Sequence, residues 1–266
     1  MTEGRRVRLD QALVKRGLAE TRERAQSLIL SGAVNVDGAR ATRPAAPVTD
    51  HQDIRLEQTH RPDYVSRGAL KLERALDHWH LDPANLVALD VGASTGGFTD
   101  LLLRRGARRV YAIDVGYGQL HYKLRGDERV VSMERTNIRH LTSLPEQPDI
   151  TVVDVSFISL KLALPPVFAL TRQVILALVK PQFEAGRTEV GKTKGVVRDT
   201  QIRRQVLTDL ADWSRDQPWH MVDVVASPVR GPAGNVEFLS LWRPGTHSDP
   251  VVTPERIDLA MLDGPQ

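Results

Sequence analysis

The chain has 266 residues, which is enough for one sizeable hydrophobic core and a small additional domain. It contains no cysteine, so disulfides and thiolate metal sites are excluded. It has no apolar run of about eighteen residues that could span a membrane, and its N-terminus leads into no apolar signal segment. We therefore expect a cytoplasmic protein that is not bound to a membrane.

The formal net charge is +3, and the positive excess is unevenly distributed. Residues 1–62 contain 11 Lys and Arg against 8 Asp and Glu, whereas the remaining residues contain 25 of each kind. A basic segment beside a neutral one is typical of proteins that bind nucleic acid, because phosphate contacts supply most sequence-independent affinity. A solvated basic helix face is the plainer interpretation of the same charges.

The first sixty residues predict a small α+β domain. Apolar spacing predicts helices at residues 8–16 and 22–30, each followed by a glycine. The turn dipeptide Asp37-Gly38 predicts a hairpin that starts with residues 34–36. Two prolines then interrupt the chain before a further short strand at residues 54–56.

Two runs in this segment, residues 8–17 and 21–38, closely resemble the small RNA-binding domain named after ribosomal small-subunit protein four. In such domains, two helices present basic side chains to folded RNA. The resemblance therefore implies that basic residues here contact RNA, and Arg67 is a further candidate near the start of the next domain. The N-terminal candidates are Arg5, Arg6, Arg8, Lys15, Arg16, Arg22 and Arg24.

The rest of the chain predicts an α/β domain of the Rossmann-like kind. A helix is expected around residues 68–79, and helical segments alternate with the first five strands, which favours a mainly parallel sheet of seven strands. The last two strands are joined by a Pro- and Gly-rich segment at residues 227–235, which predicts an antiparallel hairpin at one edge. The expected strands are residues 87–91, 110–114, 130–133, 150–154, 174–179, 221–226 and 238–242.

These patterns predict four segments along the chain. Residues 1–60 form the RNA-binding domain, residues 61–66 the linker and residues 67–245 the catalytic domain. Residues 246–266 form a C-terminal tail with a short helix at residues 254–262.

A glycine-rich turn is the most informative feature of the second domain. The strand before Gly92 runs into glycines at positions 92, 96 and 97, and the next strand ends in Asp114 about twenty residues later. Such a turn lets the backbone approach an adenosine-containing cofactor, while the acid accepts hydrogen bonds from the ribose hydroxyls. The glycines do not form the dinucleotide motif GxGxxG, and their spacing suits S-adenosylmethionine, which has no pyrophosphate.

Ligands of open α/β sheets bind beyond the carboxyl ends of the strands. There we expect Gly92, Gly96 and Phe98 on the methionine and ribose side and Asn137 at the adenine amine. Asp154 is expected near the transferred methyl group. The full predicted set of cofactor-binding residues is Asp90, Gly92, Ser94, Gly96, Phe98, Asp114, Asn137 and Asp154.

The sequence of residues 92–96, Gly-Ala-Ser-Thr-Gly, also matches the nucleophile elbow of α/β-hydrolases. Acidic and histidine partners for Ser94 follow in the chain, at Asp114, His121, His140 and His220. However, only one strand of this domain precedes Ser94, whereas an elbow normally follows several. The hydrolase interpretation is therefore disfavoured.

Four charged residues, Lys71, Asp154, Lys180 and Glu237, suggest a shared role. Asp154 and Lys180 close apolar strands, where a charge is costly unless it is paired or functional. Their order and placement resemble the catalytic tetrad of the FtsJ-type ribose 2′-O-methyltransferases. This resemblance implies that all four are catalytic residues.

With the N-terminal domain included, residues 5–243 resemble the TlyA family of bacterial ribosomal RNA 2′-O-methyltransferases, which are sometimes labelled hemolysins. The linker departs from the family pattern, because Tyr64 stands where tryptophan is found in other members. The segments that carry the resemblance are residues 65–71, 90–99, 114–120, 154–159, 179–184 and 227–237.

The resemblance implies ribose 2′-O-methylation of cytidine in 16S ribosomal RNA, 23S ribosomal RNA or both, in assembled ribosomal subunits. S-adenosylmethionine is the implied cofactor, and we expect a monomer that requires no metal. Lys180 is either a neutral general base for the 2′-hydroxyl or a charged group that stabilises the alkoxide, and ordinary lysines are charged at pH 7. One alternative is an RNA-binding factor without transferase activity. A membrane-active hemolysin is disfavoured, because no amphipathic or apolar membrane segment is present.

Overall fold

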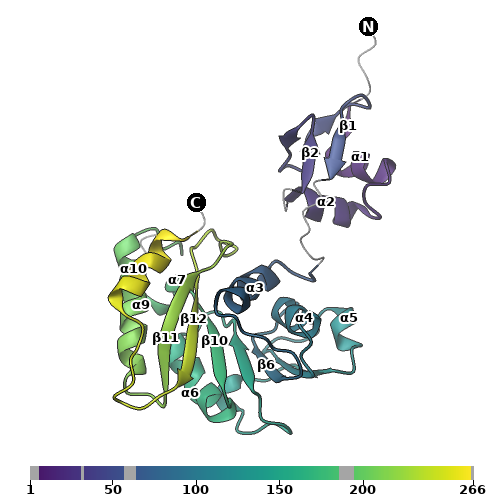
Figure 1. Cartoon of the computed structure of the whole chain (residues 1–266). Coiled ribbons are helices and arrows are strands. Elements are labelled where there is room, and N and C mark those ends of the chain that lie inside the picture. The colour runs from purple at the N-terminus through teal and green to yellow at the C-terminus, as the bar shows by residue number, and fades with distance from the viewer. Residues whose placement is uncertain (1–5, 31–32, 57–63, 186–194, 265–266) are drawn as a thin grey trace. The chain divides into compact units, whose positions relative to one another are not determined.

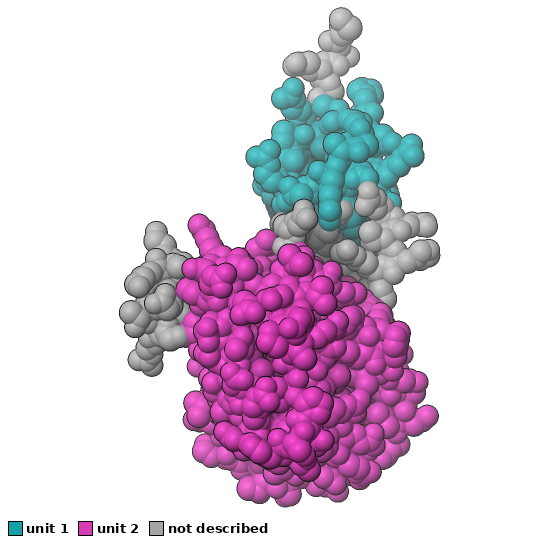
Figure 2. Space-filling model, turned by 60° about the vertical axis from the view of Figure 1, so that its left-hand side comes forward, with its two compact units in different colours: residues 1–63 teal, residues 64–266 magenta. Residues whose placement is uncertain are grey.

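The computed structural model describes residues 6–30, 33–56, 64–185 and 195–264, and it divides the chain into two compact units. The first unit comprises residues 1–63 and the second residues 64–266 (Figure 2). Arg5 lies outside the described residues, and so does the side chain of Arg24. Each unit is considered separately below.

The N-terminal unit packs two helices against short antiparallel strands. Strands β3, β2 and β5 form one sheet in that order, and β1 pairs with β4 in a second sheet. Leu9, Leu13, Ile29 and Val34 are among the fully buried side chains of its core. The elements are β1 (Val7–Arg8), α1 (Leu9–Lys15), α2 (Arg22–Leu30), β2 (Val34–Val36), β3 (Ala39–Arg40), β4 (Pro47–Val48) and β5 (Ile54–Leu56).

The predicted helices, hairpin and last strand of this unit are present, but the pair of β1 and β4 was not predicted. Each of these strands has only two residues, which is too short for an alternating pattern to show in the sequence. Pro47 is compatible with β4 because this strand has a neighbour on only one side. The first helix also begins one residue later than predicted, because Arg8 belongs to β1.

The second unit is built on a seven-stranded sheet with the order β11-β12-β10-β9-β6-β7-β8 (Figure 1). Neighbouring strands from β10 to β8 are parallel, and β12 is antiparallel to both β10 and β11. This confirms the predicted mainly parallel sheet with an antiparallel edge hairpin. The strands are β6 (Val87–Val91), β7 (Arg109–Ile113), β8 (Val130–Met133), β9 (Ile150–Val153), β10 (Val174–Val179), β11 (Trp219–Ala226) and β12 (Phe238–Pro244).

Helices cover both faces of this sheet, as the side-chain alternation of its strands requires. In β6, Leu89 faces a core shared with α6 and α9, whereas Ala88 faces a second core shared with α3 and α4. The helices are α3 (Gly68–His78), α4 (Gly97–Arg104), α5 (Tyr122–Arg125), the short 3₁₀ helix η1 (Ile138–His140), α6 (Leu160–Leu170), α7 (Pro181–Glu184), α9 (Thr200–Ser214) and α10 (Pro254–Leu262).

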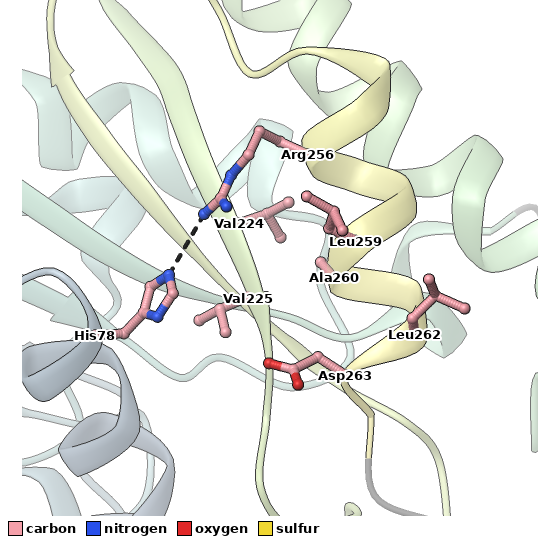
Figure 3. A pocket seen from close by; sticks show the side chains of 8 residues that line it. All are labelled: His78, Val224, Val225, Arg256, Leu259, Ala260, Leu262 and Asp263. Carbon is pink, nitrogen blue, oxygen red and sulfur yellow. Dashed lines mark hydrogen bonds between the residues drawn. The ribbon is translucent and has the colours of Figure 1, made fainter.

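The C-terminal helix α10 packs on β11 and is tied to α3. Its Arg256 forms an ion pair with Asp223 of β11 at 2.8 Å, and Asp223 also accepts a hydrogen bond from Trp79 just after α3. Figure 3 shows Arg256 reaching His78 of α3, with 3.4 Å between their nitrogens. Residues 246–264 are therefore integrated in the second unit, and their contacts fix the helix that carries Lys71.

Candidate active site

The candidate site lies where the strand order of the sheet reverses. The chain runs outward from β6 through β7 to β8, then returns to place β9 on the other side of β6. In sheets of this kind, the crevice beyond the carboxyl ends of the strands at the reversal is the ligand site. Gly92, Asp114, Asp154 and Lys180 directly follow β6, β7, β9 and β10, so all four lie at this edge.

Gly92 is the residue that lets the turn after β6 pass close to the end of β9. Its φ of 84° lies in the left-handed region, and a Cβ at this position would lie 2.4 Å from the carbonyl oxygen of Asp154. Only glycine avoids both the strain and the collision. The turn therefore brings the cofactor-binding segment and Asp154 together.

Asp114 fixes two loops at once. Its Oδ2 accepts a hydrogen bond from the backbone N–H of Ser94 at 2.8 Å, and its Oδ1 accepts one from Gly116 at 2.7 Å. A carboxylate oxygen can accept more than one hydrogen bond, so both oxygens retain capacity for a ligand. Asp114 also lines a narrow pocket together with Ser94, Gln119 and Glu134.

Glu134 lines this pocket, whereas Asn137, predicted at the adenine amine, is not among its lining residues. Glu134 Oε1 is buried and has no hydrogen-bond partner among the described residues. The Asn137 side chain instead accepts a hydrogen bond from the backbone of Arg139 and caps η1. Glu134 directly follows β8, so its place at a strand end was the pattern that could have identified it.

Asp90 is a fully buried carboxyl group beneath the site. Its Oδ2 accepts a hydrogen bond from the Thr99 hydroxyl at 2.6 Å, while its Oδ1 has no partner among the described residues. Burial, which disfavours the charged form, raises the pKa of Asp90 to about 7. The predicted cofactor role of Phe98 has less support, because its ring is 4% exposed and belongs to the core shared with α3.

The predicted tetrad forms two lysine–carboxylate pairs. Lys71 Nζ donates to Glu237 Oε2 at 2.6 Å, and Lys180 Nζ lies 2.6 Å from Asp154 Oδ1. The second contact is an ion pair whose alignment is poor for a hydrogen bond. Both lysines are at most 9% exposed, so these charges are shielded from water.

Strand register explains how the two pairs come together. Val179 of β10 is paired with Phe238 of β12, so Lys180 and Glu237 are the next positions on these adjacent strands. Lys71 reaches Glu237 from α3, which packs against α4 and β12. The structure thus joins residues that are as far apart in the chain as 166 positions.

Three residues in the segments beside Lys180 carry no predicted role. The Ser156 hydroxyl accepts a hydrogen bond from Lys180 Nζ at 2.8 Å. Phe157 has a φ of 65°, is 90% exposed and packs against Phe183 with 5.0 Å between the ring centroids. Glu184 accepts hydrogen bonds from the Ser159 hydroxyl and the Leu160 N–H, which fixes the end of this loop.

The alternative Ser94 nucleophile lacks the geometry of a hydrolase. Among the described residues, no histidine is hydrogen-bonded to the Ser94 side chain, and only β6 precedes Ser94 in the sheet. The backbone of Ser94 instead donates to Asp114.

In the N-terminal unit, three of the predicted RNA-binding arginines hold the fold together. Arg8 and Arg22 both form ion pairs with the buried Asp10. Arg16 donates to three backbone carbonyls in residues 49–52. Of the other described candidates, Lys15 lies 3.5 Å from Asp50, and Arg6 and Arg67 are exposed.

Over the part of the chain that the structure describes, no helix is long and apolar enough to cross a membrane. No cluster of three or more potential metal ligands occurs among the same residues.

Comparison with known proteins assigns both units. The family model for FtsJ-like methyltransferases matches residues 64–243, and that for the S4 domain matches residues 7–54. The 16S/23S rRNA (cytidine-2′-O)-methyltransferase TlyA of Mycobacterium tuberculosis is 47% identical, with 90% of each chain covered. YqxC of Bacillus subtilis is 45% identical over 94% of this chain and 91% of its own.

A solved structure from Streptococcus thermophilus matches with a TM-score of 0.75 and 39% identity, covering 97% of this chain and 94% of that one. The family matches agree with the α/β sheet of the second unit. The chain belongs to the FtsJ-like methyltransferase family and, within it, to the TlyA group with an N-terminal S4 domain.

Proposed function

We propose that this protein transfers a methyl group from S-adenosylmethionine to the ribose 2′-hydroxyl of a cytidine in ribosomal RNA. The observation that carries this proposal is the pair of buried lysine–carboxylate contacts beside the glycine turn of a methyltransferase fold. The similarity to the 16S/23S rRNA (cytidine-2′-O)-methyltransferase TlyA of Mycobacterium tuberculosis supports cytidine 2′-O-methylation of 16S and 23S ribosomal RNA.

The residues at the carboxyl edge of β6, β7 and β8 suit S-adenosylmethionine. Gly92 keeps the turn open, and Asp114 offers acceptors for the ribose hydroxyls. The buried Oε1 of Glu134 and the buried Oδ1 of Asp90 lack partners among the described residues, so each can accept a hydrogen bond from a ligand or an enclosed water. Bound S-adenosylmethionine supplies an electrophilic methyl group.

Lys180 is the residue that we propose acts on the 2′-hydroxyl. Each lysine of the tetrad lies within ion-pair distance of one carboxylate, so four charged groups form two balanced pairs. Ser156 and Asp154 orient the Nζ of Lys180. The ammonium would stabilise the ribose oxygen as its proton passes to water and the methyl carbon exchanges its bond to the sulfonium sulfur for a bond to this oxygen, which leaves a neutral thioether. Much of the rate enhancement comes from alignment of these atoms.

The surroundings of the tetrad suit RNA. The Phe157 ring is 90% exposed beside Lys180 and offers a face on which a base can stack, as single-stranded RNA recognition requires. The S4 domain supplies a second contact with the ribosomal particle, through basic side chains such as those of Arg6 and Lys15. Arg67, exposed just before α3, is a further candidate for a phosphate contact.

The direct test is methyl transfer to purified ribosomal subunits that lack ribose methylation. The purified protein and S-adenosylmethionine should produce 2′-O-methylcytidine, located by primer extension, in small subunits, large subunits or both. The unmodified subunits without enzyme are the control. Tight binding to the subunits with no methyl transfer would instead support an RNA-binding factor without activity.

A further inference from the structure

An open hollow of about 470 Å³ beside the tetrad is lined by three arginines. Arg198 precedes α9, Arg203 lies in the first turn of α9, and Arg230 lies in the loop before β12. Val197 and Val236 form part of its apolar lining. The three arginines come from two segments that are far apart in the chain, residues 196–203 and the loop before β12, so the fold gathers them in one place.

A buried asparagine holds the two main segments of the hollow together. Asn235 is 1% exposed, and its Oδ1 accepts a hydrogen bond from Val197 N–H at 2.9 Å. Its Nδ2 donates to the carbonyl of Gly195 at 2.9 Å. This double contact fixes the backbone next to Arg198 against the loop that carries Arg230. The arrangement of the arginines therefore belongs to the folded structure of the site.

Arg203 keeps part of its guanidinium group available at the hollow. Asp199 is one acid beside it among the described residues, and its carboxylate caps α9 by accepting from Gln201 N–H. Arg203 uses its Nε and Nη2 to contact Arg198 O, Asp199 O and the Thr200 hydroxyl, while its Nη1 has no hydrogen bond with a described residue. Burial and, after it, the neighbouring charge of Arg230 lower the pKa of Arg203.

The loop that lines the hollow also passes close to Glu237. Val236 lines it and directly precedes Glu237, which pairs with Lys71. Arg230 is followed by Gly231, where an added Cβ would lie 2.3 Å from Glu237 Oε1. This position can be occupied only by glycine unless the catalytic carboxylate moves. The loop is therefore built around Glu237 and presents Arg230 next to it.

We propose that this arginine pocket, formed by Arg198, Arg203 and Arg230, binds a backbone phosphate of the RNA strand that carries the target ribose. The proposal rests on the proposed function and names a substrate contact that lies outside the tetrad and the S4 domain. The guanidinium fork matches the oxygens of a phosphate, and every ribose in a strand is flanked by phosphates. A phosphate held here fixes which ribose reaches Lys180.

The test compares two adjacent arginines of α9. Arg203→Gln removes a charge from the pocket. Arg204→Gln removes a charge that pairs with Asp258 of α10 and does not line the pocket. Affinity for unmethylated small and large ribosomal subunits is measured across a salt series, together with single-turnover methyl transfer. Arg230→Gln is the second pocket variant, Arg203→Lys is the charge-retaining variant, and thermal unfolding verifies that every variant is folded.

We expect Arg203→Gln and Arg230→Gln each to weaken subunit binding about tenfold. Each should also reduce the slope of log affinity against log salt by about 0.7 to 0.9, the value for one lost phosphate contact. Arg203→Lys should retain most of this slope, and Arg204→Gln should match the unsubstituted protein. Unchanged affinity and slope in both pocket variants, or equal losses in Arg203→Gln and Arg204→Gln, would overturn the proposal.

The same assay separates failure of the pocket from failure of the proposed function. If the unsubstituted protein transfers methyl groups and the pocket variants keep its affinity and salt slope, only the phosphate site is refuted. If the pocket variants show reduced salt slopes but neither the unsubstituted protein nor any variant transfers methyl groups, the phosphate site is supported and the proposed function is refuted.

Discussion

Asp10 of the N-terminal unit and Asp90 of the catalytic unit are both fully buried, but they differ in how completely their oxygens are satisfied. Asp10 accepts hydrogen bonds from Arg8, Arg22 and the Gln26 side chain. Asp90 accepts one from Thr99 and leaves its Oδ1 without a described partner. A carboxylate that is saturated within its domain stabilises the fold, whereas one left with free capacity marks a place where a ligand or water binds.

The largest expected effect concerns Lys180, which we propose acts on the reaction. Lys180→Ala should lower the single-turnover rate of methyl transfer about 10²- to 10⁴-fold, the usual contribution of one acid–base or charge-stabilising group. Thermal unfolding, cofactor affinity and subunit affinity should stay close to those of the unsubstituted protein. Transfer at the original rate would remove Lys180 from the mechanism and direct attention to Lys71.

The next effect concerns the pH dependence that Asp90 confers. Its pKa is raised from 3.8 to about 7 in the folded state, so the unfolded chain loses this proton first as pH rises. The contribution of Asp90 to the unfolding free energy should therefore fall between about pH 4 and pH 7, by about 4 kcal/mol at about 1.4 kcal/mol per pKa unit.

Asp90→Asn tests this sign. The stability of the variant relative to the unsubstituted protein should rise from pH 4 to pH 8, as measured by urea unfolding at both values. Comparing the two pH values cancels the constant cost of the buried amide. A difference between the two proteins that is the same at both pH values would show that Asp90 keeps an ordinary pKa.

A smaller effect is expected in the N-terminal unit. Asp10→Asn leaves the guanidinium groups of Arg8 and Arg22 without their carboxylate, and it should destabilise this unit by about 2 kcal/mol. This value is below the usual loss for a broken buried pair because the arginines are 42% and 49% exposed and screened by water. Hydrogen exchange of residues 6–56 in the full chain would measure it.

The pH dependence at Asp10 should run opposite to that at Asp90. The hydrogen bond from Arg8 holds the pKa of Asp10 well below its usual range. Its stabilising contribution is therefore present above about pH 4 and is lost as pH falls towards the lowered folded value. An Asp10→Asn protein should also bind subunits more weakly while it binds the cofactor normally. Equal loss of cofactor affinity would contradict the separation of the two units.

The smallest effect is expected for the cofactor contact of Asp114. Asp114→Ala should weaken S-adenosylmethionine binding by about 1 to 3 kcal/mol, the range for lost hydrogen bonds to a charged group. Calorimetry measures this loss, and Asp127→Ala, which removes an acid paired with Arg129 away from the pocket, is the matched control. Equal affinities for the two variants would exclude the predicted ribose contact.

The sequence predicted the sheet well because its strands carry uninterrupted apolar runs, as in residues 174–179. It also singled out Asp154 and Lys180, which the structure places in contact, because charges at the ends of such runs stand out. It could not show that Lys71 pairs with Glu237, since that contact depends on how α3 packs on the sheet. The N-terminal arginines were the hardest to interpret, because phosphate contacts and an internal partner such as Asp10 require the same residue type.

The sequence also could not show which neighbouring side chain faces the site. Glu134 and Asn137 both follow β8, and only the course of the backbone decides which one faces the pocket. The exposed Phe157 depends on a left-handed backbone angle, which bulky residues rarely adopt and which the sequence does not indicate. Tertiary geometry therefore determines which of several polar or aromatic neighbours reaches the site.

The central claim is that Lys180 acts as a charged group held by Asp154 and Ser156. The most direct test is the pH dependence of single-turnover methyl transfer for the unsubstituted protein and for Lys180→Arg. A charged stabiliser predicts that Lys180→Arg retains measurable activity and that no rising limb distinguishes the two profiles. An inactive Lys180→Arg protein, together with an unsubstituted rate that climbs with pH to a plateau, would show that Lys180 works as a neutral base.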